Sequence, residues 1–258
     1  MKISRPAFAL TAVLISGCGG GGGGGYGGSS PPSPLPVQGI YYGSYTVNGA
    51  PTPVNVYGAI DSGGFAYFAD SLGNLYVLPT IMDTGSLSGT MTAYAPPGQT
   101  FPTGQSVTTF DVIGNTSANG VFVTGTFSQP GESGTFQLNY EPLSISRITV
   151  SVGSYQGFYW GNGGNTAIAI TVNLNNTFSG SDGFGCQISG TMTPVPGFNL
   201  FTVTANLTGQ AICAGSVSGL GFAGTEDLTG QFGGVPGVYF YIGVSNANAG
   251  FAAEFKSQ

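Results

Sequence analysis

The feature that most constrains this chain is a succession of short alternating runs, with no helical period longer than a turn after residue 36. Runs rich in Val, Ile, Thr, Phe and Tyr recur between clusters of Gly, Asn, Asp and Pro, as at 166–174 and 199–207. Alternation of apolar and polar residues is typical of strands, because successive side chains of a strand point to opposite faces. Asn175 and Asn176 predict a tight hairpin, since Asn tolerates a positive φ. The pattern predicts an all-β body.

The composition excludes several classes of function. Of 258 residues, 47 are Gly, only 5% are charged and none is His, whereas about a quarter of residues are usually charged. Four basic residues cannot neutralise a run of phosphates, so nucleic acid is not an expected partner. Without His, a His-based catalytic triad or a His metal site is excluded. Periodic runs of Glu, Lys, Ala and Leu are lacking, so a helical bundle is not expected.

Short motifs recur in the same order in the two halves of the chain. Residues 39–45 and 153–159 share the pattern Gly-x-Tyr-x-Gly-x-Tyr, and three further motifs pair 88–92 with 189–193, 110–112 with 201–203, and 121–125 with 211–215. The spacing between partners decreases along the chain, which we interpret as shorter loops in the second half. The repeats predict two homologous domains.

We place the first domain at 37–145 and the second at 146–258. Each half offers enough short strands for a closed or nearly closed sheet, without room for crossover helices, so the strands should pair antiparallel. The expected fold is all-β: two tandem small antiparallel β-barrels or curved sandwiches, of which the sequence favours neither. Closure would protect strand edges that carry few charges.

The N-terminal segment resembles an export signal. Lys2 and Arg5 precede an apolar run at 7–15 that is too short to cross a bilayer. The residues Leu-Ile-Ser-Gly before Cys18 are similar to a bacterial lipobox, which implies cleavage before Cys18 and a lipid on its thiol. Residues 1–17 would then be a lipoprotein signal peptide; an ordinary signal peptide followed by a chance Cys is the alternative.

Residues 18–36 are expected to be a disordered tether. Residues 19–28 are almost all Gly and residues 29–36 are rich in Pro and Ser, and neither part can bury apolar surface. Few basic residues remain after Cys18, so binding to anionic headgroups is disfavoured and membrane attachment would depend on acyl chains.

The two other cysteines predict a disulfide. Cys186 and Cys213 both fall in the second domain, and an even pair in an oxidising compartment should be oxidised. A redox or metal pair is the alternative, and it is disfavoured because no basic neighbour would lower a thiol pKa.

No catalytic site, metal or cofactor is assigned. The segment 219–224 matches a dinucleotide pattern but lacks the strand and helix that give the pattern meaning. Glu226 and Asp227 are adjacent, so on a strand they would face opposite ways. The other acidic residues are scattered, mostly at turn positions. A carboxylate pair brought together by folding, as in a glycosidase or a Ca²⁺ site, remains an open alternative.

Aromatic residues gather at the start of each repeat. The candidates are Tyr41, Tyr45, Tyr155, Tyr159 and Trp160. One interpretation is packing in the core; the other is a binding surface or barrel mouth, because Tyr offers a large rigid contact with a polar tip. Few charges lie nearby, so such a surface would suit neutral or apolar ligands, glycans or proteins.

Several of these motifs together resemble a family. The lipobox with its Gly-rich tether, the start at Gly153, the Asn-Asn-Thr-Phe-Ser-Gly segment at 175–180 and the strand beginning at Cys186 are similar to uncharacterised outer-membrane lipoproteins of β-proteobacteria. The resemblance implies a comparable Cys pair in the second half. Gly19, in place of Asp after the lipid-bearing Cys, implies sorting to the outer membrane. The family offers no catalytic residues to transfer.

The expected function is therefore non-catalytic. The chain is predicted to be a lipid-anchored bacterial envelope protein, in the outer membrane, with a binding, interaction or structural role. The alternative is a carrier that holds a small apolar ligand inside a β-barrel. A membrane-inserted barrel and an enzyme are further alternatives. The expected partners are the membrane, through the anchor, and a protein, a glycan or a small apolar ligand.

Overall fold

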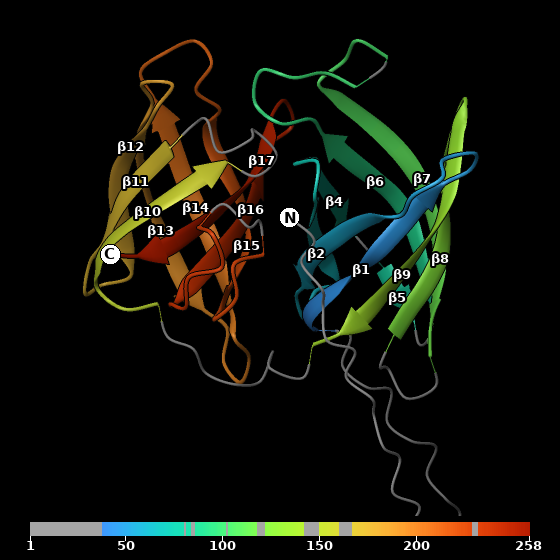
Figure 1. The fold of residues 1–258 in the computed structure, drawn as a ribbon, viewed down its shortest axis with the longest axis horizontal. Coiled ribbons are helices and arrows are strands. Elements are labelled where there is room, and N and C mark those ends of the chain that lie inside the picture. The colour runs from blue at the N-terminus through green and yellow to red at the C-terminus, as the bar shows by residue number, and fades with distance from the viewer. Residues whose placement is uncertain are drawn as a thin grey trace, which may run out of the picture. The chain divides into compact units, whose positions relative to one another are not determined.

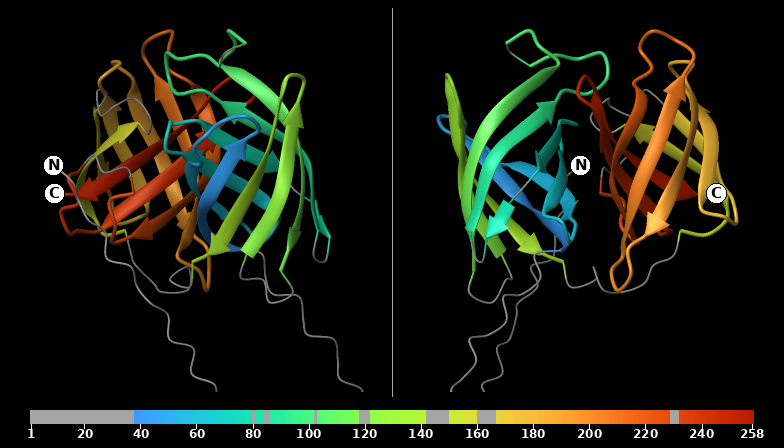
Figure 2. Two further views of the ribbon diagram at one scale, coloured as in Figure 1. Left: turned by 45° about the vertical axis from the view of Figure 1, so that its right-hand side comes forward. Right: turned by 180° about the vertical axis from the view of Figure 1, so that it is seen from behind.

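The computed structural model describes residues 38–79, 81–83, 86–101, 103–117, 122–141, 150–159, 167–228 and 232–258. The predicted signal peptide, the tether with Cys18, the domain boundary at 145 and Trp160 lie outside these ranges. Every regular element in the described residues is a strand, so the all-β prediction is confirmed. Of the two architectures left open, the structure has the barrel, twice (Figures 1 and 2).

The first barrel is an antiparallel meander that closes on itself. Its order runs from β4 through β3, β2, β1, β9, β8 and β7 to β6, and β4 also pairs with β6. The strands are β1 (Gly39–Val47), β2 (Val54–Ile60), β3 (Phe65–Asp70), β4 (Leu75–Pro79), β5 (Ile81–Asp83), β6 (Ser86–Tyr94), β7 (Val107–Thr116), β8 (Phe122–Gln129) and β9 (Glu132–Tyr140).

Strands β4 and β5 act as one interrupted strand. Leu75 pairs with Tyr94 and Ile81 pairs with Ser88, which is the same register along β6. Because β4 and β5 pair with β6 in one register, they count as a single strand, and the first barrel then has eight strands. Counted in this way, β6 is the fifth strand of the barrel and β7 the sixth.

The second barrel contains eight strands in sequence order, closed by pairing of β10 with β17. They are β10 (Gly153–Tyr159), β11 (Ala167–Val172), β12 (Thr177–Asp182), β13 (Gln187–Pro194), β14 (Leu200–Thr208), β15 (Gly215–Gly224), β16 (Tyr239–Ser245) and β17 (Gly250–Ser257). Figure 1 shows these strands wound around one axis.

Glycine permits the tight curvature of both walls. A Cβ added to Gly43 on β1 would lie 1.9 Å from the carbonyl oxygen of Gln137, and one added to Gly180 on β12 would lie 1.9 Å from that of Ala169. Only a residue without a side chain allows strands to approach so closely at a bend.

The repeat is present, but not with the strand correspondence expected from the sequence. The tyrosine motifs lie on the first strand of each barrel. The Ser-Gly-Thr-Met-Thr motifs at 88–92 and 189–193, however, lie on the fifth strand of the first barrel and the fourth strand of the second. The motifs starting at Phe110 and Phe201 are offset in the same way. The first decrease in spacing, between the tyrosine motifs and the Ser-Gly-Thr-Met-Thr motifs, therefore reflects a shift of one strand and not shorter loops. The next decrease does reflect a shorter connection, since 12 residues separate β6 from β7 and only five separate β13 from β14.

Candidate functional site

The tyrosine motif places two aromatic side chains of each first strand inside its barrel. On β1, Tyr41, Gly43 and Tyr45 occupy alternate positions and so share one face. Tyr41 is 1% exposed, whereas Tyr42 on the opposite face is 43% exposed. On β10, Tyr155 and Tyr159 are buried in the same manner. Alternation along the strand thus directs the motif to the barrel interior.

An aspartate at the end of the third strand organises the turn that follows it. In the first barrel, Asp70 Oδ1 accepts hydrogen bonds from the backbone N–H groups of Leu72 and Asn74, each at 2.9 Å. Gly73 completes the turn with φ 94°, a conformation that favours glycine. A short turn closed by its own Asp side chain is a common hairpin connection.

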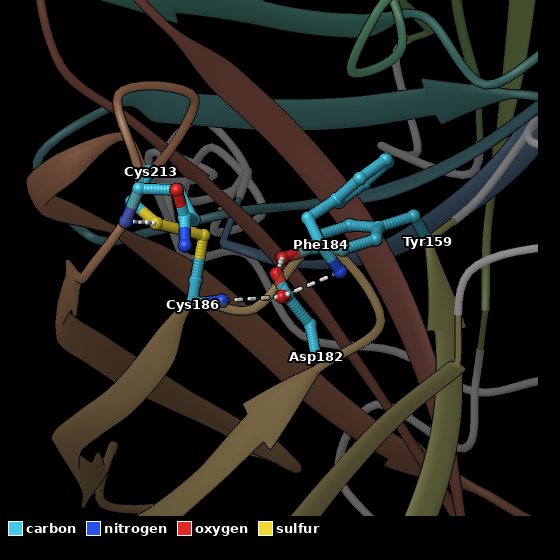
Figure 3. Close-up of a disulfide and its surroundings, with 6 residues drawn as sticks. Tyr159, Asp182, Phe184, Cys186 and Cys213 are labelled. Carbon is cyan, nitrogen blue, oxygen red and sulfur yellow. Dashed lines mark hydrogen bonds between the residues drawn. A yellow bond between two sulfur atoms is a disulfide. The ribbon is translucent and has the colours of Figure 1, made fainter.

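The second barrel repeats this turn with the same spacing. Asp182 Oδ1 accepts hydrogen bonds from the N–H of Phe184 at 3.0 Å and from that of Cys186 at 2.9 Å, and Gly185 has φ 85°. Figure 3 shows both hydrogen bonds reaching the Asp182 carboxylate.

The second tyrosine of each motif donates a hydrogen bond to this aspartate. The hydroxyl of Tyr45 lies 2.8 Å from Asp70 Oδ2, and that of Tyr159 lies 2.6 Å from Asp182 Oδ2. First and third strands are thereby joined at equivalent places in the two barrels. This pairing of Tyr with Asp is the most specific feature that the repeats share.

The first barrel adds further donors to its aspartate. Asp70 Oδ2 also accepts hydrogen bonds from the Tyr76 hydroxyl at 2.9 Å and from Asn74 Nδ2 at 2.8 Å. The side chain of Asp70 is fully buried, and five donors satisfy it, as a buried carboxylate requires. Burial, followed by the charge of Asp70, raises the pKa of both Tyr45 and Tyr76 well above its ordinary value. These phenols stay protonated through the physiological pH range.

A cavity of about 90 Å³ lies inside the first barrel, next to this cluster. All eight strands of the barrel contribute side chains to it, with β4 and β5 counted as one. Most of the lining is apolar: Val56, Phe68, Leu78, Leu87, Met91, Phe110, Val112, Phe127, Phe136 and Leu138. Its polar lining residues are Tyr45, Tyr76 and Glu132. The cavity is thus an apolar space with polar groups near Asp70.

Glu132 is held in place by a short chain of hydrogen bonds. Gln129 Nε2 donates to Glu132 Oε2 at 2.9 Å, and Gln129 Oε1 accepts from the Thr108 hydroxyl at 2.9 Å. The second bond fixes which end of the Gln129 amide faces Glu132. The position of the Glu132 carboxylate at the cavity is therefore defined by neighbouring strands.

Aromatic rings fill the interior of the second barrel instead. The rings of Phe240 and Phe255 stack with centroids 4.5 Å apart, and the ring of Tyr155 meets that of Phe240 edge-on at 4.9 Å. Tyr159 packs in the same way against Phe251 at 4.9 Å. Stacked and edge-on aromatic pairs thus occupy the part of the second barrel where Tyr155, Tyr159 and Phe240 meet.

The predicted site residues fall into three groups. Tyr41, Tyr155 and Tyr159 are each at most 2% exposed, so an open aromatic surface formed by them is wrong and core packing is the correct alternative, because alternation turns them inward. Tyr45 is partly buried and lines the cavity. Cys18 and Trp160 lie outside the described residues.

The predicted disulfide is formed between Cys186 and Cys213, whose Cα atoms are 5.7 Å apart (Figure 3). It joins the turn of Asp182 to the connection between β14 and β15. Cys186 is buried, and its N–H is one of the donors to Asp182. The disulfide therefore supports the Tyr159–Asp182 pair in the second barrel.

Sequence reasoning missed Asp70 and Glu132, which it placed among scattered turn acids. A signal for Asp70 was present: both repeats carry Asp-x-x-Gly after the tyrosine motif, at 70–73 and 182–185. For Glu132 no such signal exists, because its role depends on which side chains surround it.

The described residues contain no group of three His, Cys, Asp or Glu side chains placed to hold a metal ion. In the same part of the chain, no helix is long and apolar enough to cross a membrane.

Comparison of the chain with known proteins gave no relative. No family model matches the sequence, and neither the curated proteins nor the solved structures contain a significant match. The features that bear on function are therefore the two barrels, their Tyr–Asp pairs, the disulfide and the apolar cavity inside the first barrel.

Proposed function

We propose that this chain is a non-catalytic binding protein of the bacterial envelope, anchored by lipid at Cys18, and that its first barrel binds a small apolar group. The observation that carries the proposal is the cavity of about 90 Å³ lined from all sides of that barrel. The lipid anchor, the outer-membrane location and the lack of catalytic activity are inferences from the sequence alone.

The cost of leaving the cavity empty supports a binding role. Protein interiors are close-packed, and an unfilled cavity costs about 24 cal/mol per Å³, or about 2 kcal/mol for this volume. The second barrel demonstrates that the fold can be filled with aromatic rings. A ligand that occupies the first barrel would recover the lost contacts.

The volume limits what the barrel takes. A cavity of about 150 Å³ lined by apolar side chains accepts benzene, and this cavity is smaller. The ligand therefore inserts a short alkyl end or a comparable small apolar group. An anchored protein would meet such molecules at the membrane surface.

Mass spectrometry under native conditions tests the binding role. The full chain carrying Cys18→Ser, expressed for export to a periplasm, should carry a small molecule that is released on unfolding. Addition of short-chain alcohols to the stripped protein should restore an adduct of one molecule per chain. A protein that has the bare mass and takes up no alcohol would contradict the proposal.

Filling the cavity gives a prediction on stability. Val112 lines the cavity and Val203 lies in the packed second core, and both are buried. We expect Val112→Phe to cost less than about 1 kcal/mol and to abolish ligand uptake, because the new ring occupies empty space. Val203→Phe should cost about 1–3 kcal/mol, as overpacking does.

Urea denaturation of the two Phe variants measures this difference. Leu87→Phe, at another wall of the cavity, repeats the test should Val112→Phe disturb its strand. Equal losses of stability in the two barrels would mean that the first barrel has no usable space.

The anchor gives a separate prediction. Cys18→Ser should move the whole chain from the membrane to the soluble fraction, because the proposed acyl chains are lost and the remaining sequence has few basic residues to hold it at a lipid surface. Cell fractionation measures the change, and Ser30→Ala in the tether is the control that should remain in the membrane. A Cys18→Ser chain that stays in membranes and resists carbonate would point to a membrane-inserted barrel.

A further inference from the structure

The polar end of the cavity in the first barrel presents hydrogen-bond acceptors to a ligand. The hydroxyl hydrogens of Tyr45 and Tyr76 are committed to their own cluster, since both oxygens lie within 2.9 Å of Asp70 Oδ2 and 3.1 Å from each other. A phenol whose hydrogen is engaged can still accept through its lone pairs. Asp70 itself is saturated by its five donors, so the two phenol oxygens are what the cluster offers.

Glu132 adds a charged acceptor. Its Oε2 is occupied by Gln129 Nε2, and the hydrogen bonds of the described residues place no donor on Oε1. The carboxylate lines the cavity together with Tyr45 and Tyr76. Its charge is close enough to contribute, after burial and Asp70, to the raised pKa of Tyr45.

The first barrel supplies no positive charge to balance these carboxylates. Residues 38–141 contain no Lys, Arg or His. Two carboxylates next to a low-dielectric apolar space therefore create a negative potential without an internal counter-ion. A ligand that brings a cation would remove this imbalance, whereas an anionic one would increase it.

We propose that the ligand of the first barrel is a small alkyl amine in its ammonium form, with its apolar end in the cavity and its N–H groups directed at Glu132 and the oxygens of Tyr45 and Tyr76. An ammonium group has three donors and no acceptor, which matches a site that offers only acceptors. Carboxylate ligands such as short fatty acids are excluded by the same argument. This inference rests on the proposed binding function and defines the chemistry of its ligand.

Three probes of equal chain length, short enough for a cavity of about 90 Å³, test the head group: n-butylammonium, 1-butanol and butanoate at neutral pH. The protein is the full chain carrying Cys18→Ser, labelled with ¹³C at its methionine methyl groups. Met91 lines the cavity and Met192 lies in the second core, so the Met91 signal should move on titration while the Met192 signal stays. We expect n-butylammonium to bind at least about tenfold tighter than 1-butanol, because a charge-assisted hydrogen bond adds to the apolar contact. Butanoate should bind at least about tenfold weaker than the alcohol.

A matched pair of variants tests the part played by Glu132. Glu132→Gln keeps the shape of the side chain and should remove the tenfold preference for ammonium while leaving 1-butanol binding within about twofold. Asp111→Asn removes the same charge from an exposed position on β7, and should leave the preference intact. The comparison of the three probes uses the chain in which Glu132 and Asp111 are unchanged, so it does not depend on whether either variant folds.

The outcomes separate the two proposals. If none of the probes shifts Met91, the binding function itself fails. If 1-butanol shifts Met91 but n-butylammonium binds no tighter, or butanoate binds best, the barrel binds apolar groups and the ammonium proposal is overturned. Equal loss of preference in Glu132→Gln and Asp111→Asn would also overturn it, since the site would then respond only to net charge.

Discussion

Asp70→Ala is expected to destabilise the protein by about 3–5 kcal/mol. The Asp70 side chain is fully buried and accepts hydrogen bonds from two phenols, one amide and two backbone N–H groups. Its removal takes the carboxylate from these donors at a position that is itself fully buried. A buried donor left unsatisfied costs about 1–3 kcal/mol, and breaking a buried charged cluster typically costs about 3–5 kcal/mol. Urea denaturation, monitored by far-UV circular dichroism, measures the loss of stability.

Asp61→Ala is the matched control for this change. Asp61 Oδ1 accepts hydrogen bonds from the N–H groups of Gly63 and Phe65 at 2.8 and 2.9 Å, which is the turn geometry of Asp70 at a solvent-accessible position. Water can replace the lost carboxylate there, so we expect a cost of about 1 kcal/mol or less. A similar loss in the two variants would show that the turn, and not the buried cluster, accounts for the effect.

A double-mutant cycle measures how much the hydrogen bond from the Tyr45 hydroxyl to Asp70 contributes to stability. Tyr45→Phe removes one donor to Asp70, and the effect of Asp70→Ala should be smaller in that background, because one fewer group is left unpaired. Independent, additive effects would contradict the role assigned to this hydrogen bond. Asp182→Ala, the equivalent change in the second barrel, should fall between Asp70→Ala and Asp61→Ala, since Asp182 accepts from one phenol and two N–H groups.

Local patterns in the sequence predicted the strands and their class. The alternating runs at 166–174 and 199–207 correspond to β11 and β14, to within a few residues. The hairpin predicted at Asn175 and Asn176 is present, with Asn176 at φ 59°. These features depend on neighbours in sequence, which is why a single sequence contains them.

Barrel closure could not be decided in the same way. Closure depends on pairing of β1 with β9 and of β10 with β17. These strands are far apart in the chain, and the local sequence of a strand does not specify which distant strand it pairs with. Motif matching failed for a related reason: short strands rich in Gly and Thr resemble one another, so 88–92 was matched to the wrong strand of the second barrel. The cavity depends on the summed volumes of inward side chains, which alternation alone does not define.

The aromatic residues could be located from the sequence, but their partners could not. The sequence located Tyr45 and Tyr159 as a repeated feature, but it did not place them inside the barrels. Their partners, Asp70 and Asp182, lie more than twenty residues further along the chain. Only the curvature of the first three strands brings each pair together, and that curvature is a property of the closed barrel.

Removal of the Cys186–Cys213 disulfide is expected to cost about 3–4 kcal/mol, with the effect on the second barrel. The bridge spans 27 residues, and cross-linking a loop of this length restricts the unfolded chain by about that amount in the chain-entropy description. The double variant Cys186→Ala/Cys213→Ala, compared with the oxidised protein in urea, measures the loss. Addition of a reductant should destabilise the oxidised protein and leave the double variant unchanged.

The disulfide also holds a specific local structure, and this gives the prediction a second readout. Cys186 follows the turn of Asp182, and its N–H donates to the Asp182 carboxylate that accepts from Tyr159. Without the bridge, amide hydrogen exchange should increase at Phe184 and Cys186, the two donors of this turn, because the free energy of local opening falls. The matching turn at Asp70 has no Cys and serves as an internal control: exchange at Leu72 and Asn74 should not change. Equal acceleration in both turns would mean that the disulfide stabilises the whole chain and has no local role in the second barrel.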